Sequence, residues 1–387
     1  MQIVRGASPR PIQNFITTES DGVNWIKIGD VSPNEKYLSK TNEKITKEGA
    51  QKSRYLRPGD FILSNSMSFG RPYILKTDGC IHDGWIAMSE YDAHLTSGYL
   101  YEVLNSNFVQ DYWKQKANNG GAMSNLNSDI VKSTIIPIPS LSEQQRIVGI
   151  LDTFTSSIEN LKEQIAQRRK QYEYYRDQLL SFDDCEIIEK LSFGKDFMLK
   201  ARIGWQGLTK KEYRESGDYK LITGTDFTKY NRIDFDNCVF VDKERYDQDP
   251  YIQIHEDDVL ITKDGTLGKI AYIDKLDMPA TLNGGVFVVR DNSERVLQKF
   301  LMYYLTSFYF VNWMKHNHTQ GSIQHLTQAL LSKFSIPVIS KEKQKSILCK
   351  LDAFTDAIRN LEQQLALREK QYEYYRNKLL TFDQEEN

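Results

Sequence analysis

Two clusters of basic, aromatic and amide side chains have the composition of a surface that binds nucleic acid. The stretch KARIGWQGLTKKEYR, residues 200–214, carries five basic side chains against one acid, with Trp205 and Gln206 among them. The stretch RGASPRPIQNF, residues 5–15, carries two arginines with no acid before Glu19. Lysine and arginine suit phosphate oxygens, whereas arginine, glutamine, asparagine and serine can read base edges. Composition alone leaves open that each cluster is only a solvated face.

The sequence shows no arrangement typical of a catalytic or metal site. The stretch TKDGTLGK, residues 262–269, lacks the GxxxxGK[ST] spacing of a phosphate-binding loop, and Ile270 stands where its metal-binding hydroxyl would be. His316 and His318 have no Cys or carboxylate at a ligand spacing. Neither the Asn-Pro-Pro-aromatic motif of a methyltransferase nor a dinucleotide fingerprint occurs. We therefore predict a chain that binds rather than reacts, with no catalytic residue, no metal site and no cofactor of its own.

Composition restricts the partners and the compartment. The chain of 387 residues has a formal net charge of −2, so any nucleic-acid surface must be local. The four cysteines have no CxxC spacing, which is typical of reduced thiols rather than of disulfides or Cys-ligated zinc. No apolar run is long enough to span a membrane or to form a signal peptide. We expect a soluble cytoplasmic protein of two or three domains with no membrane partner.

The sequence repeats itself. Shifted by 200 positions, KQYEYYRDQLLSF at residues 170–182 falls on KQYEYYRNKLLTF at residues 370–382, and Gly84 falls on Gly284. With a small offset, SNSMSFGR at residues 64–71 lies over TKDGTLGK. One unit of about 200 residues is therefore used twice, and each copy ends in a long helix.

Each long helix carries an apolar seam at alternating steps of four and three residues, which is typical of a coiled coil. The polar member of the seam is Arg168 in the first copy and Arg368 in the second. Each arginine either reaches solvent over its apolar stem or fixes the register of pairing. Ser142 and Gln145 are expected to form a capping box at the start of the first helix. The predicted helix-pairing side chains are Leu151, Ile158, Leu161, Arg168, Tyr172, Tyr175, Leu351, Ile358, Leu361, Arg368, Tyr372 and Tyr375.

Chain length fixes the direction of pairing. A helix of about 40 residues is roughly 60 Å long, whereas the segment between Phe182 and Phe193 spans at most roughly 40 Å. The second variable part must stay near the far end of the first helix and must also feed the start of the second helix. We therefore predict antiparallel helices that separate two similar domains about a pseudo-twofold axis.

The variable part of each copy has the pattern of an α+β domain with a mixed sheet. Short alternating runs such as FILS and KIAYI are bounded by turn residues, and helical stretches follow at residues 99–116 and 296–315. The predicted segments are a first domain at 1–140, a long helix at 141–183, a linker at 184–192, a second domain at 193–339 and a long helix at 340–383.

The two copies begin differently. The second opens with KLSFGKDFMLKARIG, whereas the first opens with MQIVRG, so the strand before Arg5 is expected to be missing. Either the start is truncated or the C-terminal tail completes the first domain.

Several stretches resemble a known family. IIPIPSLSEQQRIVGILD leading into KQYEYYRDQLLSF, with its repeat, is similar to specificity subunits of type I restriction-modification systems, the HsdS family. RGASPRPI, GVNWIKIGD and RIGWQGLTKKEY resemble the openings of their target-recognition domains. The resemblance covers nearly the whole chain. It implies that each domain reads one half of a bipartite, asymmetric site in double-stranded DNA while the two helices set the spacer.

The resemblance also implies a division of labour. Two modification (methyltransferase) subunits and restriction subunits would dock on this chain, and they would carry adenine methylation with S-adenosylmethionine and cleavage with ATP and Mg. A coiled-coil scaffold that organises two protein-binding domains is the alternative, and DNA affinity that falls steeply with salt would separate the two. The predicted DNA-binding residues are Arg5, Ser8, Arg10, Asn65, Ser66, Arg71, Arg202, Trp205, Gln206, Lys210, Lys263 and Lys269.

Overall fold

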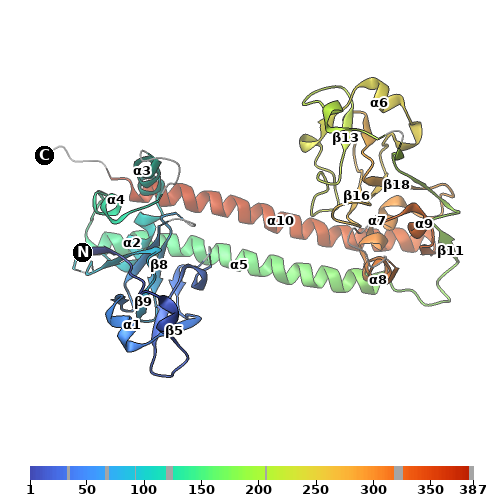
Figure 1. Cartoon of the computed structure of the whole chain (residues 1–387). Helices are drawn as coiled ribbons and strands as arrows, with labels where there is room; N and C mark the ends of the chain where they lie inside the picture. The colour runs from blue at the N-terminus through green and yellow to red at the C-terminus, as the bar shows by residue number, and fades with distance from the viewer. Residues whose placement is uncertain are drawn as a thin grey trace. The chain divides into compact units, whose positions relative to one another are not determined.

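The computed structural model describes residues 1–32, 35–65, 69–91, 93–118, 125–204, 207–317 and 326–382 (Figure 1). The chain divides into two compact units. Unit 1 comprises Met1–Lys162 with Gln363–Asn387, and unit 2 comprises Glu163–Glu362. The division crosses two long helices, α5 (Leu141–Leu179) and α10 (Lys341–Leu380), so each unit holds one α+β domain and a part of each helix.

The α+β domain of unit 1 contains two five-stranded mixed sheets, and the pairs β8–β4 and β3–β9 are parallel. The first sheet has the order β1 (Gln2–Arg5), β10 (Trp85–Ser89), β7 (Phe61–Ser64), β8 (Pro72–Leu75) and β4 (Tyr37–Leu38). The second has the order β2 (Ile16–Thr17), β5 (Glu43–Ile45), β3 (Val23–Ile26), β9 (Gly79–Ile81) and β6 (Arg54–Leu56). Its helices are α1 (Lys47–Gln51), α2 (Ser97–Leu104), α3 (Asn107–Asn118) and α4 (Ser128–Lys132).

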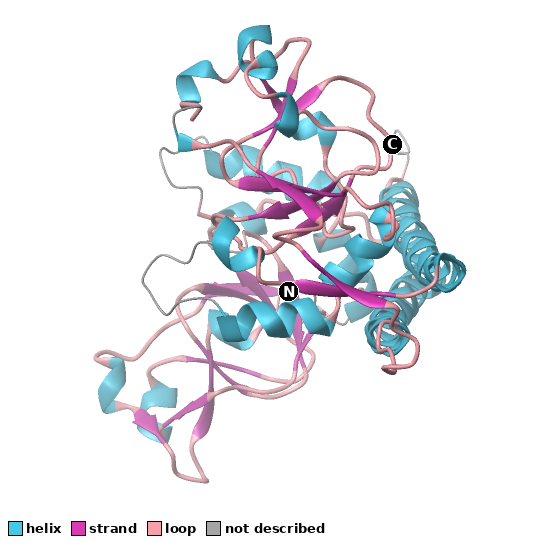
Figure 2. Cartoon of the chain, turned by 90° about the vertical axis from the view of Figure 1, so that its right-hand side faces the viewer, coloured by secondary structure: helices cyan, strands magenta, loops and turns pink. Residues whose placement is uncertain are grey.

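The domain of unit 2 has three smaller sheets joined by long loops (Figure 2). One has the order β12 (Phe197–Lys200), β18 (Val286–Asp291), β15 (Val259–Thr262) and β16 (Ile270–Tyr272). The others are β14 (Val239–Phe240), β13 (Lys220–Ile222) and β17 (Ala280–Leu282), and the pair β11 (Glu189–Ser192) and β19 (Ser335–Val338). Its helices are α6 (Lys243–Asp247), α7 (Gln298–Thr306), α8 (Phe308–Asn317) and α9 (Gln328–Leu331).

The strand order confirms the internal repeat. β1-β10-β7-β8 in unit 1 corresponds to β12-β18-β15-β16 in unit 2, and the parallel pair β3–β9 corresponds to β13–β17. The central strands β7 and β15 read FILS and VLIT, continuous runs whose residues are all buried, as expected for strands covered on both faces. In each unit the core extends from this sheet onto the long helices, at Ile147 and Leu151 in unit 1 and at Ile347 and Leu351 in unit 2.

Backbone hydrogen bonds test the predicted alignment of the two copies. The N–H of Ser64 donates to the carbonyl of Arg71 as the N–H of Thr262 donates to that of Lys269, which confirms the alignment of residues 64–71 with 262–269. The alignment of Gly84 with Gly284 is wrong by one residue. The N–H of Gly84 donates to His82 Nδ1 whereas that of Gly285 donates to Asn283 Oδ1, so the turn hydrogen bonds equate Gly84 with Gly285.

The long helices pair in the antiparallel direction inside each unit. In unit 1 the rings of Phe154 and Tyr375 stack with centroids 5.4 Å apart, and Lys162 Nζ lies 3.1 Å from Glu369 Oε1. In unit 2 Tyr175 stacks on Phe354 at 5.5 Å, and Arg169 forms an ion pair with Glu362. In both units the residue numbers rise along α5 as they fall along α10, which confirms the predicted direction.

The predicted seam residues differ in burial, and Tyr175 and Tyr375 are exposed. Leu151, Ile158, Leu161, Leu351 and Ile358 are buried, and Leu361, Tyr172, Tyr372 and Arg368 are half-buried. The guanidinium of Arg368 lies 5.7 Å from the centroid of the Phe154 ring, so this arginine packs on the seam. Arg168 is exposed and donates to Gln171 of its own helix.

Three predictions about where elements begin need correction. The capping box was expected at Ser142, but the hydroxyl that accepts from the first turn of α5 belongs to Ser140, at 3.3 Å from the N–H of Glu143. Ser340 repeats this contact at the start of α10. The strand expected to be missing before Arg5 is present as β1, and the segment 184–192, predicted to be a linker, contains β11.

The helices predicted at 99–116 and 296–315 are each broken in two, because a serine and a cap from the long helices interrupt them. Ser106 and Ser307 turn their hydroxyls back onto the preceding turn. The first N–H of α3 then donates to Asn377 Oδ1 at 3.0 Å. Asp177 Oδ1 accepts from the first N–H of α8 at 3.1 Å. The break therefore recurs in both units with the same kind of serine and the same kind of side-chain cap.

Candidate nucleic-acid interface

Three loops of unit 1 meet at the ends of β1, β7 and β10, and we call them loop cluster 1. They are residues 6–15, the described part of the turn 65–71, and the turn 82–84. The N–H of Asn65 donates to the carbonyl of Gly84 at 3.1 Å, and Asn65 Nδ2 donates to the carbonyl of Asp83 at 3.3 Å. Ser8 Oγ donates to Asp83 Oδ1 at 3.0 Å. The three loops are thus joined by hydrogen bonds around one residue.

Asp83 is the centre of loop cluster 1. Arg5 Nε donates to its carbonyl at 3.1 Å, and Arg10 Nη2 donates to Oδ2 at 3.4 Å. His82 Nε2 lies 3.1 Å from Oδ1. Partial burial pushes the pKa of the Asp83 carboxyl up, but the Ser8 hydroxyl, His82 and Arg10 together hold this pKa below its ordinary value. The carboxylate therefore stays ionised and organises cationic and polar side chains, although Arg10 itself remains 83% exposed.

Most of the residues predicted in the first domain are brought together here. Arg5, Ser8, Arg10 and Asn65 all contact Asp83, whereas Ser66 lies outside the described residues. Arg71 follows the turn and is half-buried. Sequence reasoning missed Asp83 because an acid was not expected in a DNA-facing cluster. Its position in the turn HDGW, at the start of a strand, was the available signal.

The turn between β7 and β8 requires glycine, and so does its counterpart between β15 and β16. Gly70 has φ +69° and Gly268 has φ +70°, a region that other residues rarely adopt. A Cβ on Gly70 would also lie 2.7 Å from the Trp113 ring. The repeated glycine in SNSMSFGR and TKDGTLGK therefore marks a tight turn rather than a phosphate-binding loop.

The corresponding loops of unit 2 form loop cluster 2, the described residues of 201–213 with the turns 263–269 and 283–285. The N–H of Lys263 donates to the carbonyl of Gly285 at 2.9 Å, which repeats the contact of Asn65 in unit 1. Asn283 Nδ2 donates to the Tyr213 hydroxyl at 2.7 Å. The Lys263 ammonium lies 5.3 Å from the centroid of the Phe287 ring. Loop cluster 2 thus has the backbone frame of loop cluster 1 with different side chains on it.

The predicted basic residues of unit 2 occupy different environments. Lys210 is exposed, and Lys263 and Lys269 are half-buried. Trp205 and Gln206 lie outside the described residues.

Arg202 supports loop cluster 2 from the inside. Its side chain is only 2% exposed, and its guanidinium donates to the carbonyl of Leu282 at 2.9 Å and to that of Arg245 at 3.1 Å. Gln248 Oε1 accepts a further bond at 2.9 Å. Burial lowers the pKa of the guanidinium. Arg202 therefore ties the loop to β17 and α6 in this structure, and a DNA contact by this residue stays a prediction.

Loop cluster 2 has its own acid in Glu212, which lies near Arg202. The backbone N–H of Thr209 and the guanidinium of Arg245 both donate to this carboxylate, at 2.8 Å in each case, and these bonds lower the pKa of Glu212. Arg202 and Glu212 therefore hold the described parts of 201–213 to α6.

The described part of the chain offers binding chemistry. Among these residues no group of three or more His, Cys, Asp and Glu side chains is placed to hold a metal ion. No described helix combines the length and the apolar character that a membrane span needs. Each loop cluster instead combines cationic, amide and hydroxyl groups, which can donate to phosphate oxygens and can pair with base edges.

Comparison with known proteins identifies the family. The chain matches the family described as type I restriction modification DNA specificity domain over residues 3–168 and 206–368. The chain belongs to this family. As a specificity-domain protein it carries both loop clusters inside the matched ranges, apart from residues 201–204.

Two curated proteins are similar to this chain in sequence. The specificity subunit of the type I restriction enzyme EcoR124I/EcoR124II of Escherichia coli is 30% identical over 268 residues, which are 65% of this chain and 64% of that protein. The chain thus matches a little less than two thirds of this relative's length. A putative specificity subunit of Haemophilus influenzae is 30% identical over 304 residues, 74% of this chain and 73% of that protein.

The fold itself has been seen before. A solved chain of a type I R-M system, described in terms of its complex assembly and conformational transition, aligns with a TM-score of 0.68. The alignment covers 99% of this chain and 98% of that one at 16% identity, so it shows a shared fold.

Proposed function

We propose that this specificity-domain protein is the non-catalytic, DNA-binding subunit of a cytoplasmic type I restriction-modification complex. One observation carries the proposal. Each family-matched range holds a loop cluster with the same backbone frame, and the frame presents different side chains in the two units. Asn65 in cluster 1 stands where Lys263 stands in cluster 2, and His82 stands where Asn283 does. Two similar frames with different polar groups suit a bipartite, asymmetric DNA site.

The remaining parts have complementary roles in this proposal. The exposed or half-buried donors Arg5, Arg10, Lys210 and Lys263 contact the DNA backbone and bases, and α5 and α10 set the number of unread base pairs between the half-sites. Two modification subunits, and restriction subunits where the system has them, dock on this chain. S-adenosylmethionine, ATP and Mg²⁺ act in those partners, which supply the chemistry that this chain's residues do not.

Methylome sequencing tests the proposal directly. Cells that express the modification subunit with this chain are compared with cells that express the modification subunit alone. We expect a split motif with methyladenine only when the chain is present. If the two proteins are soluble and associated but no motif appears, the proposal is wrong and the protein-scaffold alternative gains support. Binding of the purified complex to the motif should weaken steeply with salt, because phosphate contacts release counterions.

Substitutions at two equivalent positions test which loop cluster reads which half of the motif. Asn65→Ala should relax base preference in one half of the motif and Lys263→Ala in the other half, because each residue belongs to a different loop cluster. A bidentate base contact is worth roughly 1–3 kcal/mol, so a lost contact should appear as an increase of about tenfold or more in methylation of near-cognate motifs. Lys116→Ala, an exposed lysine in α3, is the matched control and should change neither half. Equal effects of Asn65→Ala on both halves would contradict the assignment.

A further inference from the structure

Glu362, near the middle of α10, receives three donors from two different parts of unit 2. Lys229 Nζ donates to Glu362 Oε1 at 3.0 Å, and the Tyr230 hydroxyl donates to Oε2 at 2.5 Å. Arg169 of α5 donates to the same carboxylate. Partial burial pushes the pKa of Glu362 up, but the hydrogen bonds from Tyr230, Lys229 and Arg169 hold it below its ordinary value. The side chain is only 13% exposed, so water competes weakly for these bonds.

The loop that carries Lys229 and Tyr230 is braced within the α+β domain. Thr228 Oγ1 donates to the carbonyl of Arg232 at 3.0 Å and accepts from the N–H of Tyr230 at 3.3 Å, which closes the loop. The carbonyl of Asn231 accepts from the N–H of Tyr272 in β16 at 2.9 Å. The loop is therefore held against the sheet, so its contact with Glu362 couples the position of the sheet to that of α10.

A second attachment joins the same domain to α10 ten positions earlier. Asp352 accepts from Lys299 Nζ and from the Tyr303 hydroxyl of α7, both at 2.7 Å. At 1.5 Å per residue the Asp352 and Glu362 attachments are about 15 Å apart along α10. Two separated attachments on one rigid helix define the tilt of the domain, which a single attachment leaves free.

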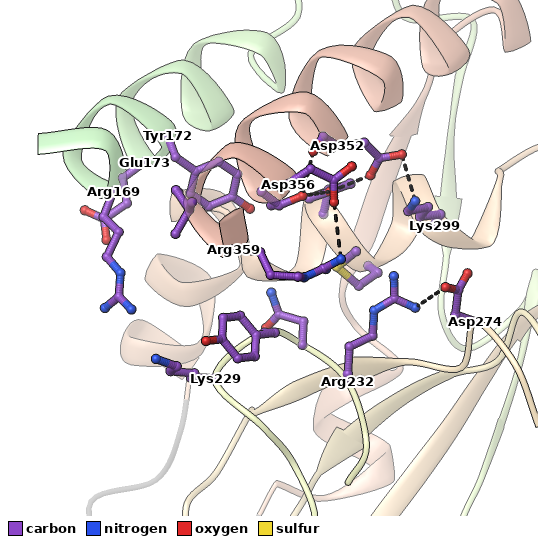
Figure 3. Close-up of a pocket in the computed structure, with 16 residues that line it drawn as sticks. Arg169, Tyr172, Glu173, Lys229, Arg232, Asp274, Lys299, Asp352, Asp356 and Arg359 are labelled. Carbon is purple, nitrogen blue, oxygen red and sulfur yellow. Dashed lines mark hydrogen bonds and ion pairs between the residues drawn. The ribbon is translucent and has the colours of Figure 1, made fainter. Parts of the chain in front are cut away.

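The space between the two attachments is not filled by side chains. A cavity of about 400 Å³ lies there, lined by residues of α5, α7 and α10 and of the loop 228–232. Figure 3 shows Lys229 and Arg232 on the loop side of the cavity and Asp352, Asp356 and Arg359 on the α10 side. Arg232 pairs with Asp274 and Arg359 with Asp356, so the charges that line the cavity are mostly paired with each other. The packed core of unit 2 reaches α10 at Ile347 and Leu351, on the near side of the cavity. On the far side the Glu362 contact is placed to resist tilting.

Unit 1 has a different arrangement at the matching place. The residue 200 positions before Glu362 is Lys162, which pairs with Glu369 of the opposite helix. Lys36 of the unit 1 domain lies with its Nζ 3.8 Å from Asp152 Oδ1, at the position that corresponds to Asp352 and not to Glu362. The Lys229–Tyr230–Glu362 contact is therefore a property of the second domain and its own stretch of α10, and does not belong to the repeated helix seam.

We propose that Glu362, with Lys229 and Tyr230, is a positioning residue that fixes the tilt of the second recognition domain on α10 and so sharpens the length of the gap accepted between the two half-sites. The proposal rests on the proposed function and adds to it. A domain free to tilt presents its loop cluster over a range of positions, so targets with one base pair more or fewer in the gap become acceptable.

The variant that tests it removes the domain's half of the contact and spares the helix pair. Lys229→Ala with Tyr230→Phe leaves the Arg169–Glu362 pair in place. Arg169→Ala, the matched control, removes the helix pair and leaves the contact of the domain. Each full-length chain is prepared in complex with its modification subunit and tested on duplexes that carry the cognate gap or a gap changed by one base pair. We expect the double variant to lose about tenfold of the discrimination between gaps, the effect of one charge-assisted hydrogen bond, and Arg169→Ala to keep it.

A distance measurement supplies a readout that does not involve DNA. Spin labels are placed at Glu244 in α6 and at Lys170 in α5, after the exposed Cys185 and Cys349 have been replaced by serine. The distance distribution should be broader in the double variant than in the parent or in Arg169→Ala. An unchanged distribution together with unchanged gap discrimination would overturn the positioning role. A parent complex that binds no split target would instead overturn the proposed function, so the two failures are distinguishable.

Discussion

The two units hold their α+β domains on the same pair of helices by one set of shared contacts and one set that differs. In the shared set a fully buried glutamine, Gln144 or Gln344, inserts between the long helix and the domain. Gln344 accepts from the N–H of Leu297 and donates to the carbonyls of Arg295 and Ile339, all at 2.8–2.9 Å. Gln144 repeats the three bonds in unit 1 with Thr96, His94 and Pro139.

The contacts that differ lie further along the helices. In unit 1 the Tyr372 hydroxyl donates to the buried carboxylate of Glu102 at 2.8 Å. The corresponding residues of unit 2 are Tyr172 and Tyr303, because Thr96 and Ser106 of unit 1 match Leu297 and Ser307. In unit 2 the domain reaches Glu362, for which unit 1 has Lys162. The comparison teaches that the junction between each domain and the start of its long helix is fixed by the same glutamine hydrogen bonds in both units. The contacts further along the helices differ between the two domains. Each recognition domain can therefore change in sequence while the glutamine contacts with the helix are kept.

The largest expected effect is loss of a shared glutamine. Gln344→Leu leaves one N–H and two carbonyls buried without their partner, so we expect unit 2 to lose about 3–5 kcal/mol of stability. Hydrogen exchange of α7 in the full chain measures this loss, because it reports each unit separately. Gln144→Leu should cost unit 1 a similar amount. Gln145→Leu, an exposed neighbour, is the control and should change stability by less than about 0.5 kcal/mol. Unequal losses of stability in the two units would contradict the claim that Gln144 and Gln344 have the same role.

An intermediate effect is expected at Glu102, which is 1% exposed. Burial raises the pKa of this carboxyl above its ordinary value of 4.5, against the opposing hydrogen bond from Tyr372 and the charges of Lys36 and Arg376. Below the ordinary value the folded and unfolded chains both hold the proton. As the pH rises from there through the raised folded pKa, the unfolded chain releases its proton first and unit 1 loses stability.

Glu102→Gln should remove this pH dependence and make unit 1 about 1–2 kcal/mol more stable near pH 7, since a buried charge is no longer needed. Urea unfolding monitored by hydrogen exchange at several pH values measures the effect. Met302→Gln, at a buried position of α7 in unit 2 that carries no ionisable group, is the control and should introduce no pH dependence. A pH profile unchanged by Glu102→Gln would mean that the Tyr372 bond fully compensates the burial.

The smallest effect distinguishes the two ion pairs of the seam. The side chains of Lys162 and Glu369 are each about half exposed, so a double-mutant cycle should give a coupling of only about 0.2–0.5 kcal/mol that weakens with salt. The pair Arg169 and Glu362 involves a carboxylate that is largely shielded, and its coupling should be larger and less sensitive to salt. Equal couplings at high salt would show that burial of Glu362 has no energetic consequence.

Much of the fold could be predicted because it follows local rules. The seam of α5 and α10 repeats every three or four residues, and a pattern of that length specifies a helix and its partner without any knowledge of the rest of the chain. Helix breaks at Ser106 and Ser307 could not be predicted, since the caps that make them come from Asn377 and Asp177 on another helix. The register error at Gly84 arose because the offset between the two copies changes from 198 positions at Ser64 and Thr262 to 201 at Gly84 and Gly285, and no periodicity reveals such a change.

The candidate site was predicted in part. The clusters of basic and amide residues predicted DNA contacts, which stay predictions. The structure brings four of these residues together around Asp83, namely Arg5, Ser8, Arg10 and Asn65. Nothing in the sequence distinguished Arg10, which faces solvent, from Arg202, which supports a loop internally. Arg10 follows β1 and Arg202 follows β12, each in a segment rich in turn-forming and polar residues. The difference in their exposure to solvent therefore depends on what packs against each side chain.

The sequence by itself determined the duplication, the α+β class, the helix seam and the family, because these are written in residue types at regular or repeated spacings. It also determined the antiparallel direction of the helices, because the segment that joins the two copies is too short for a parallel pair. The tertiary structure alone decided which groups meet. Ser8 and Asp83 are 75 positions apart, Arg202 and Leu282 are 80 apart, and Lys229 and Glu362 are 133 apart. Hydrogen bonds act over about 3 Å, so such pairs exist only once packing has brought distant segments together, and no local pattern encodes them.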